Sequence, residues 1–135
     1  MLAGYSGTPL PKKLGIKAGS VIRLFDEPDG FVDSLEPASA GFVEGKDNVD
    51  VIVVFAEWEV RLLELLKLAV PAMRMNGGLW IGWPKKASKV PTDITEDRLR
   101  DILLPTGLVD NKVCAIDEKW SGLRFVWRVE LRSKR

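Results

Sequence analysis

The clearest pattern in the chain is a continuously apolar run at residues 51–55, Val-Ile-Val-Val-Phe. A strand without alternating polar positions is typical of a sheet covered on both faces. Between residues 57 and 75, apolar side chains recur every three or four positions, which predicts an amphipathic helix. A second apolar run follows at 79–83. We therefore expect strands 51–55 and 79–83 to lie side by side and parallel, with helix 57–75 as the crossover.

The sequence also predicts how this helix ends. Pro71 lacks an amide hydrogen and should disturb the last turns. The tripeptide Asn76-Gly77-Gly78 then offers glycines that suit a left-handed helix exit. We expect the chain to leave the helix there and enter strand 79–83.

Shorter patterns predict the elements on the amino-terminal side. Residues 20–25 are β-prone and stop at the turn-rich segment 26–30, so they form the first predicted strand. Weaker signals predict a short helix that is capped by hydroxyls at Ser6 or Thr8 and ends at Gly15. They also predict a helical turn at 31–35 and a short strand at 41–44.

Downstream, Asp93 and Glu96 have the spacing of a capping box, which predicts a helix that continues to residue 104 and is closed by residues 105–107. Its inward face would hold four apolar side chains, those of Ile94, Leu99, Ile102 and Leu103. Strands are expected at 113–116 and 123–129, joined by a turn that contains Ser121 and Gly122. The order of elements indicates a single domain, 1–135, of the α/β class: a three-layer, Rossmann-like, mostly parallel sheet that ends in an antiparallel hairpin.

The composition removes several classes of function. The chain has no histidine and one cysteine among its 135 residues, so Ser-His-Asp triads, Cys-His pairs, histidine zinc sites and internal disulfides are excluded. A single cysteine fits a reducing compartment. No apolar run approaches the length of a membrane helix, and the first residues do not resemble a signal peptide. We expect a cytoplasmic protein with no membrane contact.

Charge is distributed unevenly along the chain. Residues 24–60 contain ten acids and one base, which gives 1 − 10 = −9. The other residues hold 19 bases and nine acids, which gives 19 − 9 = +10. The folded surface can mix these charges or keep them apart, and the mixed surface is the more common outcome.

Two resemblances follow from these motifs. Residues 50–129 resemble the carboxyl-terminal half of a class I S-adenosylmethionine-dependent methyltransferase, which implies a truncated methyltransferase-like fold. The segments YSGTPL at 5–10, WPKK at 83–86 and WSGL at 120–123 resemble those of a small bacterial family that is known only as a domain of unknown function. That second resemblance spans nearly the whole chain and implies no activity.

The expected cofactor turn departs from the methyltransferase pattern. Such enzymes follow the first strand with a glycine-rich turn, whereas here residues 26–30 read Asp-Glu-Pro-Asp-Gly. Only Gly30 remains, and three carboxylates would repel the carboxylate of the cofactor. Glu44, at the end of a predicted strand, has the position of an acid that binds a ribose, although a solvated glutamate is the ordinary alternative. We expect no tight binding of S-adenosylmethionine.

A basic loop is the second candidate site. The side chains of Lys85, Lys86, Ser88 and Lys89 follow a predicted strand end, the edge where open α/β sheets bind ligands. With Trp83 as an aromatic floor and Trp120 exposed in a turn, they would form a shallow surface for an anion. The alternative is a solvated loop with Trp83 in the core.

The remaining candidates favour structural roles. Trp58, Trp80 and Trp127 lie within predicted elements and are expected in the core or on a sheet face. Cys114 lies in a predicted strand, which indicates a buried, inert thiol. A polar cluster formed by Tyr5, Ser6, Thr8, Lys12 and Lys13 is explained by a helix cap and an exposed helix.

Two classes of function remain. The first is a non-catalytic binding protein on a methyltransferase-like scaffold, without a cofactor, whose basic segments and exposed tryptophan meet an acidic small molecule or an acidic macromolecule. The alternative is a small S-adenosylmethionine-dependent methyltransferase, or a nucleotide-binding enzyme, with an atypical cofactor turn. In an enzyme of this composition, Asp, Glu or Lys must serve as the acid or base.

Overall fold

The computed structural model describes residues 9–35 and 43–132, which form a six-stranded mixed sheet. The strands are β1 (Val21–Phe25), β2 (Val43–Glu44), β3 (Val49–Phe55), β4 (Met73–Pro84), β5 (Leu108–Ala115) and β6 (Trp120–Trp127), in the spatial order β2-β1-β3-β4-β6-β5. The first four are mutually parallel, whereas β6 runs antiparallel to both β4 and β5. This sheet confirms the predicted Rossmann-like class and the closing hairpin.

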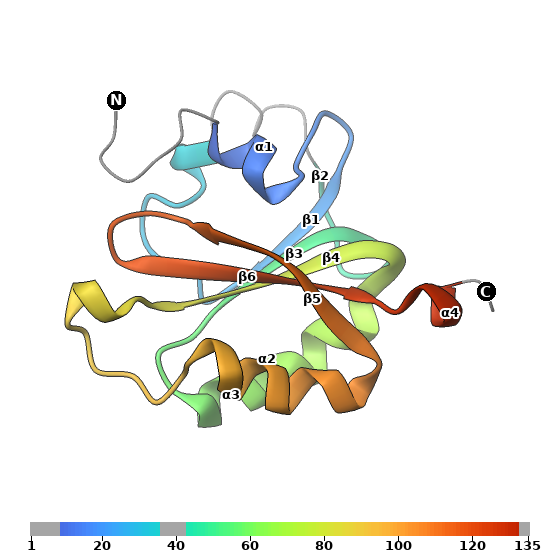
Figure 1. The fold of residues 1–135 in the computed structure, drawn as a ribbon. Coiled ribbons are helices and arrows are strands. Elements are labelled where there is room, and N and C mark those ends of the chain that lie inside the picture. Colours follow the sequence, from blue (N-terminus) through green and yellow to red (C-terminus); the bar gives the residue numbers. More distant parts are fainter. Residues whose placement is uncertain (1–8, 36–42, 133–135) are drawn as a thin grey trace.

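Helices cover both faces of the sheet. The α-helices are α1 (Leu10–Leu14), α2 (Glu59–Ala72), α3 (Glu96–Leu103) and α4 (Val129–Arg132), and the 3-10 turns are η1 (Asp33–Leu35), η3 (Lys86–Ser88) and η4 (Leu104–Thr106). Figure 1 shows α2 and α3 on one face and α1 on the other. The three predicted layers are therefore present, although the α1 layer is built from a shorter helix and loops.

The central apolar strand is placed as predicted. β3 pairs in parallel with β1 on one side and with β4 on the other, and the register joins Val53 to Leu24 and to Trp80. Val53 is completely buried. Helix α2 connects β3 to β4, so it is the expected crossover between two adjacent parallel strands.

Each face of the sheet carries its own apolar cluster. On the α2 and α3 face, the cluster includes Ile52, Val54, Leu62, Leu65, Ile81, Leu99, Leu103 and Phe125. On the α1 face, it includes Leu14, Ile16, Ile22, Phe31, Val53, Phe55, Trp80 and Trp120. The predicted inward face of the third helix is thus confirmed, with Ile94, Leu99 and Leu103 buried and Ile102 partly buried.

The end of α2 differs from the prediction. The helix stops at Ala72, just after Pro71, and β4 begins at the next residue. The segment predicted as a left-handed exit is instead part of β4, and its glycines have no positive φ. Val49 of β3 pairs with Met73 of β4, and the next paired residues are Val51 and Gly78. β4 therefore contains a bulge of three extra residues between these two pairs.

Close approach explains the first of these glycines. A Cβ on Gly77 would lie 2.8 Å from the carbonyl oxygen of Val49 and 2.9 Å from that of Asp50. Contacts this short are incompatible with any side chain unless the backbone shifts. Gly77 is therefore needed because the bulge brings two backbones together, and not because of a helix cap.

The capping-box prediction is also wrong in detail. The N-cap of α3 is Thr95, whose Oγ1 accepts a hydrogen bond from the Arg98 amide at 3.1 Å. Asp93 instead caps α2, because its Oδ1 accepts from the Glu59 amide at 2.8 Å. The sequence contained the right cap chemistry, but it did not show which helix the aspartate serves.

The closing hairpin turns earlier than predicted. Ser121 and Gly122 belong to β6, where they pair with Ala115 and Cys114. The turn is formed around Asp117, whose Oδ1 accepts from the amides of Lys119 and Trp120, both at 2.8 Å. An Asx turn of this kind fixes the hairpin without a glycine.

Shorter elements on the amino-terminal side match their predictions. Helix α1 ends at Gly15, which has the left-handed φ of 81° expected of a C-cap glycine. The helical turn at 31–35 contains η1, and the short strand at 41–44 contains β2, with residues 41 and 42 outside the described part. The predicted hydroxyl cap is wrong, because the N-cap of α1 is Pro9, which has no side-chain hydroxyl; Ser6 and Thr8 themselves lie outside the described residues.

Candidate functional site

The strand order defines a candidate crevice. From β1 the chain moves outward to β2, then returns to β3 on the other side of β1, and continues outward to β4. In open α/β sheets, ligands bind outside the carboxyl ends of the strands where the order reverses in this way. The reversal here lies between β1 and β3, so the turns that begin at Asp26 and Ala56 border the candidate site.

The turn after β1 is partly neutralised from α2. Arg61 donates two hydrogen bonds to the Asp26 carboxylate, from Nε at 2.7 Å and from Nη2 at 2.9 Å. These bonds lower the pKa of Asp26 and raise the pKa of Arg61. Asp26 also adopts a positive φ of 54°, which directs the chain out of the strand. One of the three acids that were expected to repel an anionic ligand is therefore paired.

Gly30 leaves open space at this edge. Its φ is +83°, and a Cβ built on it would meet nothing within 4 Å. The next residue, Phe31, is buried and packs edge to face on Phe55, with ring centroids 4.9 Å apart. The contact between Phe31 and Phe55 therefore holds the turn, and Gly30 leaves the space next to its Cα open.

Glu44 lies away from this turn. It pairs in register with Ile22, three residues before β1 ends at Phe25. At ~3.3 Å per residue, that offset corresponds to roughly 10 Å along the strand. The register therefore places Glu44 beside the start of β1 and away from its carboxyl end, and the ribose role of Glu44 stays a prediction.

A polar network links the ends of β3 and β4 to the hairpin. The Glu57 carboxylate pairs with Lys119 Nζ at 3.1 Å, and the Glu57 carbonyl accepts from Thr92 Oγ1. The Lys119 carbonyl in turn accepts from the Lys85 amide at 2.8 Å. Beside this network, Trp58 is 49% exposed, so its expected place in the core is wrong. Trp58 is instead an accessible aromatic side chain directly after β3.

The basic loop follows β4 as predicted. Ser88 donates to the Lys85 carbonyl at 2.7 Å and accepts from the Val90 amide at 3.2 Å, so its hydroxyl holds the loop. Lys86 and Lys89 are exposed. Within residues 9–35 and 43–132, none of the three lysines of the loop forms an ion pair. Anion binding by this loop remains a prediction.

The tryptophans assigned to this surface are buried. Trp83 and Trp120 are only 7% and 6% exposed. Because the hairpin turns at Asp117, Trp120 begins β6 and points into the core, where its ring meets that of Phe55 edge to face at 5.1 Å. The predicted aromatic floor and exposed turn tryptophan are therefore corrected, whereas Trp80 and Trp127 are buried and partly buried as expected.

The acidic segment 24–60 is matched by bases from the rest of the chain. Four of its acids form ion pairs with such bases: Asp26 with Arg61, Asp50 with Arg74, Glu57 with Lys119, and Glu59 with Arg98. The charge polarity along the sequence is therefore partly cancelled by the fold.

Other candidates carry no site in the described part of the chain. Cys114 is half-buried, and burial raises the pKa of its thiol despite the nearby Lys13 and Lys112, as expected of an inert cysteine. The described residues hold no group of three or more His, Cys, Asp or Glu side chains arranged for a metal ion. They also contain no helix with the length and apolar character to span a membrane. Tyr5, Ser6 and Thr8 lie outside these residues.

Sequence reasoning missed the cation that pairs with the turn after β1. Arg61 was visible only as part of the polar face of a helix, and it is 35 residues from Asp26. The general signal was the local excess of acid after β1, which requires a base from elsewhere. No spacing rule identifies which base supplies it.

Comparison with known proteins supports the fold. No protein-family model and no curated protein matches the chain. Among solved structures, it is similar to a fibrillarin from Aeropyrum pernix in complex with natively bound S-adenosyl-L-methionine, with a TM-score of 0.58 and 14% identity over 91% of this chain and 70% of that one. A candidate type 11 methyltransferase from Sulfolobus solfataricus has a TM-score of 0.57 and 10% identity, over 89% of this chain and 90% of that one. The fibrillarin pre-rRNA processing protein of Methanococcus jannaschii has a TM-score of 0.52 and 15% identity, over 89% of this chain and 69% of that one. The chain has the class I methyltransferase fold.

Proposed function

We propose that the chain binds S-adenosylmethionine in the crevice between the carboxyl ends of β1 and β3 and acts as a small methyltransferase. The observation that carries this proposal is the reversal of strand order between β1 and β3. It occurs in a fold shared with a fibrillarin that was solved with natively bound S-adenosyl-L-methionine. The comparison thus favours the enzyme over the non-catalytic alternative.

The residues at the crevice fit several parts of this ligand. The cofactor has a cationic sulfonium, an ammonium group and two ribose hydroxyls, all of which suit the carboxylates of Asp29 and Glu57. The pairing of Asp26 with Arg61 reduces the repulsion of the ligand carboxylate. Trp58 offers an exposed indole for an adenine ring. Gly30 leaves space for a close approach to the backbone.

The chemistry of the cofactor is the transfer of its sulfonium methyl group to a nucleophile. The chain contributes position and proton transfer. Because it contains no histidine, its carboxylates and lysines are the candidates for taking the proton of the nucleophile. Glu57 is the candidate base, since it lies two residues after the end of β3 and Lys119 pairs with its carboxylate.

Calorimetric titration with S-adenosylmethionine and with S-adenosylhomocysteine tests the proposal. We expect micromolar affinity for at least one of them and a loss of about tenfold in Trp58→Ala, because one base-stacking contact contributes ~1–3 kcal/mol. Val60→Ala is the matched control, because Val60 is exposed on the same helix. Absence of binding by the unmodified protein, or an equal loss in both variants, contradicts the proposal.

A non-catalytic protein that binds an acidic partner is the second candidate. It is supported by the basic loop, where Lys86 and Lys89 are exposed and none of the described carboxylates pairs with them. If S-adenosylmethionine does not bind while a polyanion binds in a salt-dependent manner, this second function replaces the first.

A further inference from the structure

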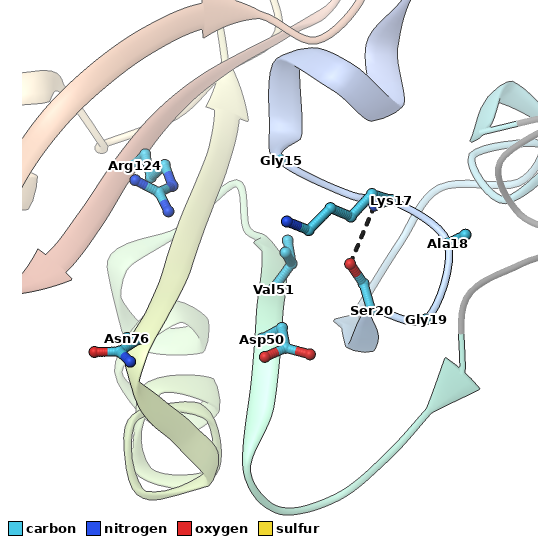
Figure 2. A pocket seen from close by; sticks show the side chains of 9 residues that line it. All are labelled: Gly15, Lys17, Ala18, Gly19, Ser20, Asp50, Val51, Asn76 and Arg124. Atoms are coloured by element: carbon cyan, nitrogen blue, oxygen red, sulfur yellow. Dashed lines mark hydrogen bonds between the residues drawn. The ribbon is translucent and has the colours of Figure 1, made fainter.

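A pocket of about 340 Å³ lies at the opposite edge of the sheet, where the parallel strands begin. Its walls come from the loop between α1 and β1, from the start of β3, and from β4 and β6. Figure 2 shows Lys17 extending from that loop toward the sheet, with Arg124 reaching in from β6. This pocket is separate from the crevice at the carboxyl edge.

A glycine makes room for the guanidinium of Arg124. A Cβ at Gly78 would lie 2.5 Å from Arg124 Nε and 2.7 Å from Nη2. The planar group therefore rests on the backbone of β4 at a position where any other residue would displace it. A defined resting place of this kind orients the donors of the arginine.

The charge of Arg124 is poorly compensated. In the part of the chain that the structure describes, no carboxylate pairs with it, and its Nη1 donates a long hydrogen bond to Asn111 Oδ1 at 3.5 Å. Burial, together with the positive charge of Arg132, lowers the pKa of Arg124. A half-buried cation beside a second cation gains most from an anion.

The loop that carries Lys17 is anchored over the pocket. The Trp80 indole donates to the Leu14 carbonyl at 3.0 Å in the buried interior, which fixes the end of α1 on the sheet. Ser20 Oγ accepts from the Lys17 amide at 3.1 Å and closes the loop. Lys17 itself is exposed, and no described acid pairs with its side chain.

The carboxylate of Asp50 also lines the pocket, but its negative charge is already paired with a cation outside it. Asp50 Oδ2 accepts from the Val21 amide at 2.8 Å, and Asp50 Oδ1 pairs with Arg74 at 3.1 Å. The pocket therefore keeps the two positive charges of Lys17 and Arg124. This balance excludes a cation and favours an anion with more than one negative oxygen.

We propose that this pocket binds the phosphate group of a small molecule, with Arg124 and Lys17 as the two cationic contacts. A guanidinium fork and a mobile ammonium from opposite walls match the several oxygens of a phosphate better than the two of a carboxylate. The volume exceeds that of the anion alone, so a phosphate monoester with a small attached group fits as well. The site is independent of the proposed methyltransferase activity.

Titration calorimetry with inorganic phosphate and with adenosine monophosphate tests this site. We expect binding of at least one probe and a loss of about tenfold or more in Lys17→Gln and in Arg124→Gln, because hydrogen bonds to charged groups are among the strongest. Gly78→Ala should weaken binding by displacing the guanidinium while both cations remain. Lys67→Gln and Arg128→Gln, which remove exposed charges elsewhere, are the matched controls and should bind as the unmodified protein does.

The outcomes separate the two sources of phosphate and the two sites. Stronger binding of adenosine monophosphate that persists at saturating S-adenosylmethionine and is lost in Lys17→Gln indicates a monoester in this pocket, whereas equal binding of the two probes indicates free phosphate. Saturation with S-adenosylmethionine should leave phosphate binding unchanged. The site is disproved if neither probe binds at millimolar concentration, or if binding survives in Lys17→Gln and Gly78→Ala. Lys17→Gln keeps the test valid if Arg124→Gln does not fold, since Lys17 is exposed.

Discussion

The two edges of the parallel sheet use charge in opposite ways. At the carboxyl edge, the acids Asp26 and Glu57 pair with Arg61 and Lys119 from other segments, whereas Glu27 and Asp29 have no ion-pair partner among the described residues. At the amino edge, Asp50 is fully engaged, whereas the cations that line the pocket have no described acid as partner. Paired charges fix the shape of a site, and unpaired charges leave interaction energy for a ligand.

This difference shows why electrostatics alone does not locate the function. The carboxyl edge has the topology of a ligand site and charges that are only partly paired, while the amino edge lacks that topology but has two pocket-lining cations without a described acidic partner. The two proposals therefore rest on different physical grounds, and the following substitutions separate them.

The largest effect on stability is expected in β3, which runs between the two edges of the sheet. Val53→Asp places a carboxylate at a completely buried position, which should cost more than about 4 kcal/mol and abolish cooperative unfolding. Val113→Asp is the matched control, because Val113 is 56% exposed on β5 and should change stability by about 1 kcal/mol or less. Equal denaturation midpoints for the two variants would show that β3 is not central.

A smaller effect should be confined to the amino edge. Trp80→Phe leaves the Leu14 carbonyl without its donor, and we expect a loss of about 1–3 kcal/mol in the free energy of unfolding. Amide exchange in the loop 15–20 should also become faster. Trp120→Phe removes a comparable ring area near the carboxyl edge and should leave that loop protected. Equal exchange in both variants would contradict the anchoring role of Trp80.

The ion pair at the carboxyl edge should have a weak, pH-dependent effect. Arg61 lowers the pKa of Asp26, so its stabilisation is present above the ordinary value of 3.8 and is lost as the pH falls through the lowered pKa. Because both side chains are substantially exposed, Asp26→Asn should cost roughly 1 kcal/mol or less at neutral pH. The unfolding curves of the variant and of the unmodified protein should differ at neutral pH and coincide at acidic pH. Asp29→Asn, in the same turn, should show no such convergence.

The smallest effect on stability is expected in the basic loop. The double variant Lys85→Gln, Lys86→Gln should have a free energy of unfolding within about 0.5 kcal/mol of that of the unmodified protein, since neither lysine has a described acidic partner. If the loop binds anions, its affinity for a polyanion should fall steeply with salt and weaken in the variant. The double variant Lys46→Gln, Lys67→Gln is the charge-matched control. An unchanged affinity in the first variant would make the loop a solvated turn.

The sequence predicted the elements whose pattern depends on burial alone. The apolar run 51–55 and the helix after it follow from periodicity, because the middle of the sheet is covered on both faces. Their boundaries were less predictable. The bulge in β4 places Gly77 against the backbone of β3. The sequence does not distinguish a glycine needed for this close approach from one needed for a left-handed turn.

The candidate site was less predictable than the fold, since its contacts join distant segments. Asp93 caps a helix 34 residues earlier in the chain, and Arg61 neutralises an acid 35 residues away. Both partners were visible as polar residues, but no local rule connects them. The pocket around Arg124 was missed for the same reason, because its walls come from four segments that lie far apart in the sequence.

The direct joint between α2 and β4 has a consequence for chain engineering. The helix ends at Ala72 and the strand begins at Met73, with no loop residue between them. Loops are where proteins tolerate inserted segments and protease cleavage, so this joint offers neither. New termini or an inserted tag belong at the turn 45–48 instead, where Gly45 and three exposed polar residues separate β2 from β3.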